Sequence, residues 1–68
     1  NGYNISDTDE ASGDGTSYFG YLYKTGAWYI MKAVKASTVT NFTYVKGDSG
    51  YDFSNRASET YDTFDNIF

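Results

Sequence analysis

The sequence predicts a small β-dominated domain of the α+β class, a three-stranded antiparallel meander followed by a C-terminal helix or extended tail. Three runs of aromatic and β-branched residues, separated by short Gly- or Ser-containing connections, indicate the strands. Apolar residues near the C-terminus recur at helical spacing, which indicates the helix. The chain has 68 residues, so it has room for one domain with a thin core.

The predicted strands lie at 18–23, 27–34 and 38–46, joined by short connections at 24–26 and 36–37. The first connection contains Gly and is short, which is typical of a β-hairpin. Because consecutive strands with short connections pair side by side, the three runs predict a meander.

Both faces of this sheet are apolar. Side chains alternate along a strand, so Trp28, Ile30 and Val34 share one face while Tyr29 and Met31 lie on the other. A sheet that is apolar on both sides needs two covers.

The C-terminal stretch is one possible cover. Its apolar residues recur every three or four positions: Phe53, Ala57, Tyr61, Phe64 and Phe68. Asp52 or Ser54 is suited to cap a helix here, whereas Thr60, Thr63 and the late acidic residues disfavour one. An extended tail whose rings insert into a groove is the alternative. The predicted core combines this stripe with the strands: Phe19, Leu22, Trp28, Ile30, Val34, Phe42, Phe53, Tyr61 and Phe64.

The sequence divides into a flexible, acidic N-terminal arm at 1–16 and a β-rich domain at 17–68. Residues 6–16 are polar and rich in Gly and Ser, which is typical of a mobile segment. Tyr3 and Ile5 alternate with polar residues, as in a short strand. The arm either pairs with the sheet edge of a neighbour or frays as a terminus.

Charge is arranged in blocks. The net charge is -4, which argues against nucleic acid or an anionic membrane as a partner, and no apolar run approaches the roughly 20 residues of a membrane span. The N-terminal 16 residues carry only acids, the final third is acidic except for Arg56, and the bases of the middle block are Lys24, Lys32, Lys35 and Lys46. Such blocks predict a basic surface that faces an acidic one, within a molecule or between neighbours.

The composition favours association with copies of the same chain or with other structural proteins. The sequence has no Cys and no His, so a disulfide or a thiolate or imidazole metal site cannot stabilise so small a core. Aromatic residues make up 21% of the chain, and Tyr and Trp are enriched at interfaces. The predicted interface consists of the four lysines together with Tyr3, Ile5, Tyr21, Tyr23, Tyr29 and Tyr44.

Catalytic and cofactor sites are not predicted. Ser and Thr lack a His to activate them, and the acids lie in polar segments, whereas a carboxylate pair for glycoside hydrolysis needs a buried site. A calcium loop starting at Asp7 fails because Ala11, Ser12 and Tyr18 occupy positions that need a ligand, a Gly and a Glu. Asn4 and Asn41 match the glycosylation acceptor pattern.

A sugar-binding surface is the alternative function. Tyr21, Tyr23, Tyr29 and Tyr44, with Trp28, would form a flat aromatic platform if their rings were exposed, and sugars stack on such platforms. The competing interpretation is that these rings fill the two buried faces of the sheet.

Several strings from Tyr18 to the end carry a resemblance to a protein group: Tyr18-Phe19-Gly20-Tyr21, Gly26-Ala27-Trp28-Tyr29-Ile30-Met31-Lys32, Tyr44-Val45-Lys46-Gly47-Asp48-Ser49-Gly50-Tyr51, Asn55-Arg56-Ala57-Ser58 and Thr60-Tyr61-Asp62-Thr63-Phe64-Asp65-Asn66-Ile67-Phe68. The chain resembles short proteins encoded in tailed-phage genomes, which are uncharacterised or described as virion structural. This resemblance covers roughly three quarters of the chain and leaves out most of the acidic arm. It implies a virion or extracellular setting and carries over no catalytic or binding residues.

Overall fold

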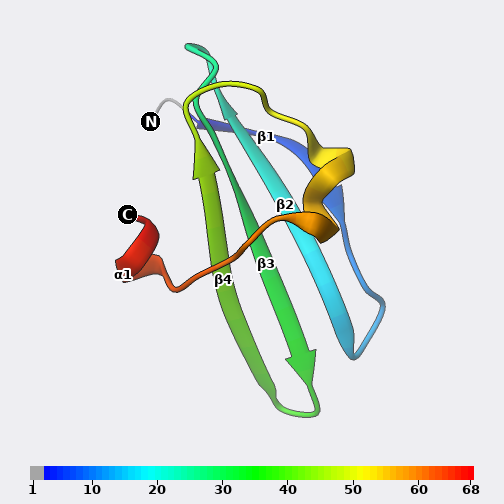
Figure 1. Ribbon diagram of the computed structural model, residues 1–68. Helices are drawn as coiled ribbons and strands as arrows, with labels where there is room; N and C mark the ends of the chain where they lie inside the picture. The colour runs from blue at the N-terminus through cyan, green and yellow to red at the C-terminus, as the bar shows by residue number, and fades with distance from the viewer. Residues whose placement is uncertain (1–2) are drawn as a thin grey trace.

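A computed structural model describes residues 3–68 (Figure 1); residues 1 and 2 of the predicted arm lie outside the described part. The fold is a four-stranded antiparallel sheet in the order β1-β2-β3-β4, so every strand pairs with its neighbour in sequence. The strands are β1 (Tyr3–Asp9), β2 (Gly15–Tyr23), β3 (Trp28–Ala36) and β4 (Val39–Gly47). The small β-dominated class and the meander are therefore confirmed.

The prediction of three strands was wrong, because the segment assigned to the arm contains β1. Tyr3 pairs with Tyr23 and Ile5 with Tyr21. The ring of Tyr3 packs 5.2 Å from that of Tyr23, and such cross-strand aromatic pairs stabilise a sheet. Asp7 and Asp9 of β1 also form hydrogen bonds within the chain, with Tyr51 and Arg56.

Tight turns join the central strands. The β2–β3 turn closes with hydrogen bonds from the Tyr23 amide to the Ala27 carbonyl and from the Gly26 amide to the Tyr23 carbonyl. Gly26 has a φ of 99° and Ser37, in the two-residue β3–β4 turn, has a φ of 59°. A positive φ is tolerated well by Gly, and single non-Gly residues adopt it in turns.

A bulge in β1 decides which face its side chains join. Ile5 is opposite Tyr21 and Asp7 is opposite Gly20, so Ser6 is an extra residue. Tyr3 and Ile5 therefore lie on one face, while Asp7 and Asp9 move to the other. Without the bulge the carboxylates would lie among the rings.

The two faces differ in how they are covered. We call the face that carries Gly20, Trp28 and Ile30 the covered face, because the segment 48–61 crosses it (yellow to orange in Figure 1). We call the opposite face the open face, with Tyr21 and Tyr29 at its centre.

We call the segment 48–61 the cover. It packs closely on the sheet because two residues of the covered face, Gly20 and Gly47, have no side chain. A Cβ at Gly20 would overlap the Tyr51 hydroxyl and approach the Phe53 ring to 2.8 Å. A Cβ at Gly47 would lie 2.6 Å from the indole of Trp28. Beneath the cover, Trp28 is 7% exposed and Ile30 is fully buried.

The helical stripe of the sequence does not form one helix. The 3₁₀-helix η1 (Phe53–Ser58) begins at Asp52, which accepts a hydrogen bond from the Ser54 amide, and α1 (Phe64–Ile67) is a single turn. Between them the chain is extended, because the backbone of Asp62 exchanges two hydrogen bonds with Tyr44 at the edge of β4. This bridge carries the chain around the edge, so that α1 reaches the open face.

Two residues assigned to the core are exposed instead. Phe42 is 50% and Phe64 is 56% exposed, because both lie on the open face, where no segment among residues 3–68 covers them. Ala33, which was not assigned to the core, is 9% exposed. The other assigned residues (Phe19, Leu22, Val34, Phe53 and Tyr61) are half-buried.

We expect Gly20→Ala to destabilise the fold by about 1–3 kcal/mol, because the added methyl group collides with Tyr51 and Phe53. Urea unfolding measures this loss. In a Tyr51→Ala background the collision with the phenol is gone and only the Phe53 ring remains close, so the double variant should be less destabilised than the sum of the two single variants. Strict additivity would contradict the close fit of the cover.

Candidate functional site

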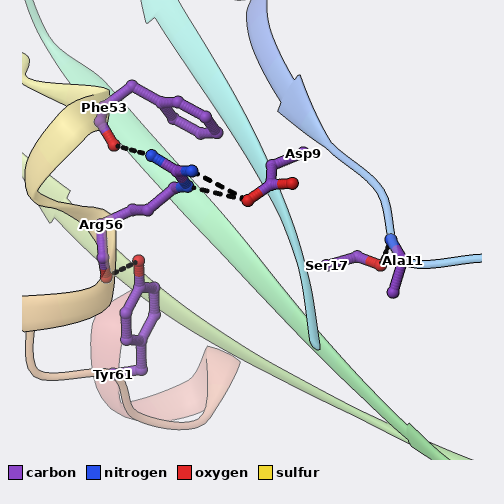
Figure 2. Close-up of polar contacts among 6 residues, drawn as sticks. All are labelled: Asp9, Ala11, Ser17, Phe53, Arg56 and Tyr61. Carbon is purple, nitrogen blue, oxygen red and sulfur yellow. Dashed lines mark hydrogen bonds and ion pairs between the residues drawn. The ribbon is translucent and has the colours of Figure 1, made fainter. Parts of the chain in front are cut away.

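The cover is held on the sheet by a charged contact. Arg56 donates to a single carboxylate oxygen of Asp9 from Nη2 at 2.9 Å and from Nε at 3.1 Å, and from Nη1 to the Phe53 carbonyl at 3.0 Å. Figure 2 shows the guanidinium between these two acceptors. The contact joins η1 to β1, at opposite ends of the sequence.

Rings surround this guanidinium. Its carbon lies 4.7 Å from the centroid of the Phe53 ring and 5.6 Å from that of Tyr18, both within cation–π range. The Tyr61 hydroxyl donates to the Arg56 carbonyl at 2.8 Å (Figure 2), and burial raises the pKa of Tyr61. Lys32 lies 5.3 Å from the centroid of the Tyr61 ring.

A second polar contact ties the start of the cover to β1. The Tyr51 hydroxyl donates to the Asp7 carboxylate at 2.8 Å, and the Trp28 indole donates to the Ser49 carbonyl at 2.7 Å. Burial, reinforced by the hydrogen bond to the Asp7 carboxylate, raises the pKa of Tyr51 to about 12. The covered face is thus a stabilising contact whose functional groups are already engaged.

The open face carries a connected cluster of rings, the ring cluster. Tyr21 and Tyr29 stack at 4.5 Å, and Tyr29 meets Tyr3 at 5.2 Å and Phe68 at 5.4 Å, each edge to face. The cluster consists of Tyr3, Tyr21, Tyr23, Tyr29, Tyr44, Phe64 and Phe68.

The ring cluster is half-buried at its centre and exposed at its rim. Burial, with the neighbouring phenols Tyr21, Tyr44 and Tyr3, raises the pKa of Tyr29. At the rim Phe64 is 56% and Phe68 is 48% exposed. Phenylalanine side chains make no hydrogen bonds to water, so covering this rim with a partner is favourable in free energy.

The predicted interface tyrosines therefore lie together on the open face, with Ile5 (56% exposed) at the same face of β1. The predicted interface lysines do not form one basic surface. Lys46 lies on the open face, 5.4 Å from the Phe68 ring centroid, and Lys24 is in the turn at that end of the sheet. Lys35 lies near the opposite end, and Lys32 is on the covered face.

Asn4 and Asn41, the two residues in glycosylation acceptor patterns, are both exposed. They occupy the two edge strands, β1 and β4, on the covered side of the sheet.

Within residues 3–68 no group of side chains is arranged to hold a metal ion, and no pocket is present. None of the helices in this described part is long and apolar enough to span a membrane. No family model, curated protein or solved structure matches the chain.

Sequence reasoning missed three phenylalanines of the open face and the role of Arg56. Phe42 and Phe64 were assigned to the core, and Phe68 was assigned to a helical stripe. No periodic pattern marks the point at which the chain turns around the β4 edge. Arg56 had a usable signal, since it is the single base among the acids of the C-terminal third and the acidic N-terminal block needs a counter-charge.

The raised pKa of Tyr51 predicts a loss of stability at alkaline pH. The ordinary value is 10.0 and the folded value is about 12, so the folded state favours the protonated phenol. This contribution is fully present below pH 10 and is lost as the pH rises through 12.

Tyr51→Phe should therefore cost about 1 kcal/mol near neutral pH, through loss of the bond to Asp7, and should lose stability less steeply than wild type above pH 10. Urea unfolding across this pH series measures both effects. Asp7→Asn is the matched control, because it keeps an acceptor but removes the charge, and it should fall between the two. Identical alkaline slopes for wild type and Tyr51→Phe would contradict the assignment.

Proposed function

We propose that this protein is a structural, self-assembling subunit, a repeating component of a virion or an extracellular filament, which binds neighbouring copies through the open face. The observation that carries the proposal is the ring cluster, whose rim is exposed at Phe64 and Phe68. Phe42 and Ile5 extend the same apolar surface across the sheet to both edge strands.

The type of side chain on the open face supports association, whereas the total exposed area of the chain does not. The chain exposes 4508 Å², close to the roughly 4,300 Å² expected for a compact monomer of this mass. The open face gathers several aromatic side chains into one apolar patch. Aromatic residues are enriched at interface cores, and contiguous exposed apolar patches mark interaction sites.

The arrangement of the rings favours a protein partner over a sugar. A sugar stacks on the flat face of an exposed ring. In the cluster Tyr21 and Tyr29 stack on each other, and the Phe64 and Phe68 rings lie nearly perpendicular to the Tyr44 ring. The rim rings also lack hydroxyl groups to bond a sugar. The alternative function, a carbohydrate-binding or adhesion module, keeps one supporting feature, which is that several phenols share the open face.

Charge plays a secondary part in this proposal. The lysines are distributed over both faces and both ends of the sheet, and Asp9 is already paired with Arg56. Burial of rings supplies the affinity, and Lys46 beside Phe68 is placed to face acids of a neighbour. The virion or extracellular setting rests on the resemblance to phage-encoded proteins.

Replacing both rim residues in Phe64→Ser/Phe68→Ser should reduce self-association, because it removes apolar area that a neighbour would bury. Sedimentation velocity over a concentration series measures the assembly size. Asp65→Ser is the matched control in the same helical turn and should behave as wild type. Assembly should persist at high salt, since apolar contacts are not screened; loosening with salt would assign the contact to the charge blocks. A wild type that stays monomeric at every accessible concentration would overturn the proposal.

A glycan screen tests the alternative. Wild type should bind no glycan at millimolar concentration, because stacking within the cluster occupies the ring faces. A hit that is lost in both Tyr23→Ala and Tyr44→Ala would favour the carbohydrate-binding function over self-assembly.

A further inference from the structure

One stretch of the sheet edge is unpaired and unprotected. β4 begins at Val39, and the Asp62 bridge occupies the edge at Tyr44. Between them nothing in residues 3–68 pairs with the outer side of Val39–Thr43. Figure 1 shows this side of β4 free below α1.

The outward hydrogen-bonding groups of this stretch follow from the bridge. The amide and carbonyl of Tyr44 both point outward, to Asp62. In an antiparallel sheet the direction alternates along the strand, so Thr40 and Phe42 also direct their backbone groups outward, while Asn41 directs its groups to β3. Thr40 and Phe42 thus present two amides and two carbonyls without a strand partner in the described chain.

The opposite edge is protected in ways that this stretch is not. β1 has the bulge at Ser6 and the carboxylates of Asp7 and Asp9, which are devices that discourage edge-to-edge pairing. The sequence from Val39 to Thr43 contains only Val, Thr, Asn and Phe, with no charge, Pro or Gly. Val39 is 58% and Phe42 is 50% exposed.

We propose that two copies of the chain pair antiparallel through Val39–Thr43, about a two-fold axis at Asn41, so that their sheets join into one. In this register Thr40 of each copy faces Phe42 of the partner copy and exchanges both backbone hydrogen bonds with it. Asn41 faces Asn41 of the partner copy at a position without hydrogen bonds. The proposal rests on the self-assembly proposed above and adds to it a second contact.

The structure selects this register. Centring the axis on Phe42 would need the outward groups of Tyr44, which Asp62 already occupies. Centring it on Thr40 would pair Phe42 with residue 38, which lies in the turn before β4. Only an axis at Asn41 uses the free stretch symmetrically, with Val39 at one end and Thr43 at the other.

A second copy is the occupant that this symmetry favours. A two-fold contact needs a surface that complements itself, and the free stretch ends at equal distances on the two sides of Asn41. Pairing brings Phe42 and its counterpart in the partner copy to diagonal positions on the open face, within reach of aromatic side chains. It also joins the two open faces into one surface.

Cysteine cross-linking tests the register, because the natural sequence contains no Cys. Facing residues at such a position have Cα atoms about 4.5 Å apart, within the disulfide range of about 4.4–6.8 Å. Asn41→Cys should form a covalent dimer under mild oxidation. Asn4→Cys, exposed on β1, is the matched control and should stay mostly monomeric. A mixture of Val39→Cys and Thr43→Cys should cross-link, whereas neither variant alone should.

A charge variant tests the same contact without oxidation. Asn41→Lys places like charges opposite each other on the axis and should weaken the edge dimer several-fold in sedimentation, whereas Asn4→Lys should not. Cross-linking of Asn41→Cys no faster than Asn4→Cys would overturn the edge proposal. So would a chain that binds an extended peptide of another protein at this edge but does not pair with itself.

The two contacts fail in different ways. If the edge contact holds and the face contact fails, wild type stops at a dimer that Asn41→Lys dissociates. If the face contact holds and the edge contact fails, Asn41→Lys leaves the assembly unchanged and Phe64→Ser/Phe68→Ser disrupts it. In the Phe64→Ser/Phe68→Ser background, Asn41→Cys should still cross-link, and the product should be a dimer and no larger.

Discussion

The attachment of the C-terminal cover to the carboxylates of β1 is the interaction on which the rest of the structure depends. Arg56 bonds Asp9 and Tyr51 bonds Asp7 across most of the length of the sequence. An exposed ion pair alone contributes at most about 1 kcal/mol. Here the ion pair lies beside the Phe53 and Tyr18 rings, and Tyr51 of the same segment packs on Trp28, so the ion pair fixes where the cover lies. With so few fully buried side chains, a displaced cover would expose most of the core.

The same arrangement makes the two faces unequal. The bulge at Ser6 turns both β1 carboxylates toward the cover and leaves the open face without an acid from β1. The chain then crosses from one face to the other around β4 and pairs with that edge at Tyr44 alone. It ends in a single helical turn that contributes two rings and no complete cover. The exposed rings of the open face and the free stretch of β4 both lie where residues 48–68 do not pass over them.

The sequence predicted the elements whose signals are local. The strands from Gly15 to Gly47 have alternating side chains and Gly or Ser turns, and they formed as a meander. β1 was missed because Tyr51 and Arg56, which bond its two carboxylates, lie far away in sequence. The C-terminal stretch was predicted as a helix or an extended tail, and it combines short helices with an extended part, because hydrogen bonds of Asp62 to β4 interrupt a periodic pattern in residues of poor helix propensity. For the candidate site, strand alternation placed the interface tyrosines on one face. The exposure of Phe42 and Phe64 could not be predicted, because it depends on which face the segment 48–61 crosses.

The distribution of acidic residues bears on whether copies with a net charge of -4 can associate. Several acids are engaged within the chain: Asp7 with Tyr51, Asp9 with Arg56, Asp14 with the Ser37 amide, Asp52 with the Ser54 amide and Asp62 with Asn66. Both proposed contacts have a lysine beside them, since Lys46 lies beside Phe68 and Lys35 is paired with Thr40. The acids beside them are Asp65, in the same helical turn as Phe64, and Asp62, at the end of the free edge stretch. At physiological ionic strength, charges separated by more than about 8 Å are largely screened. The net charge therefore keeps copies apart at low ionic strength, while at physiological salt the uncharged edge and the rings determine whether they bind.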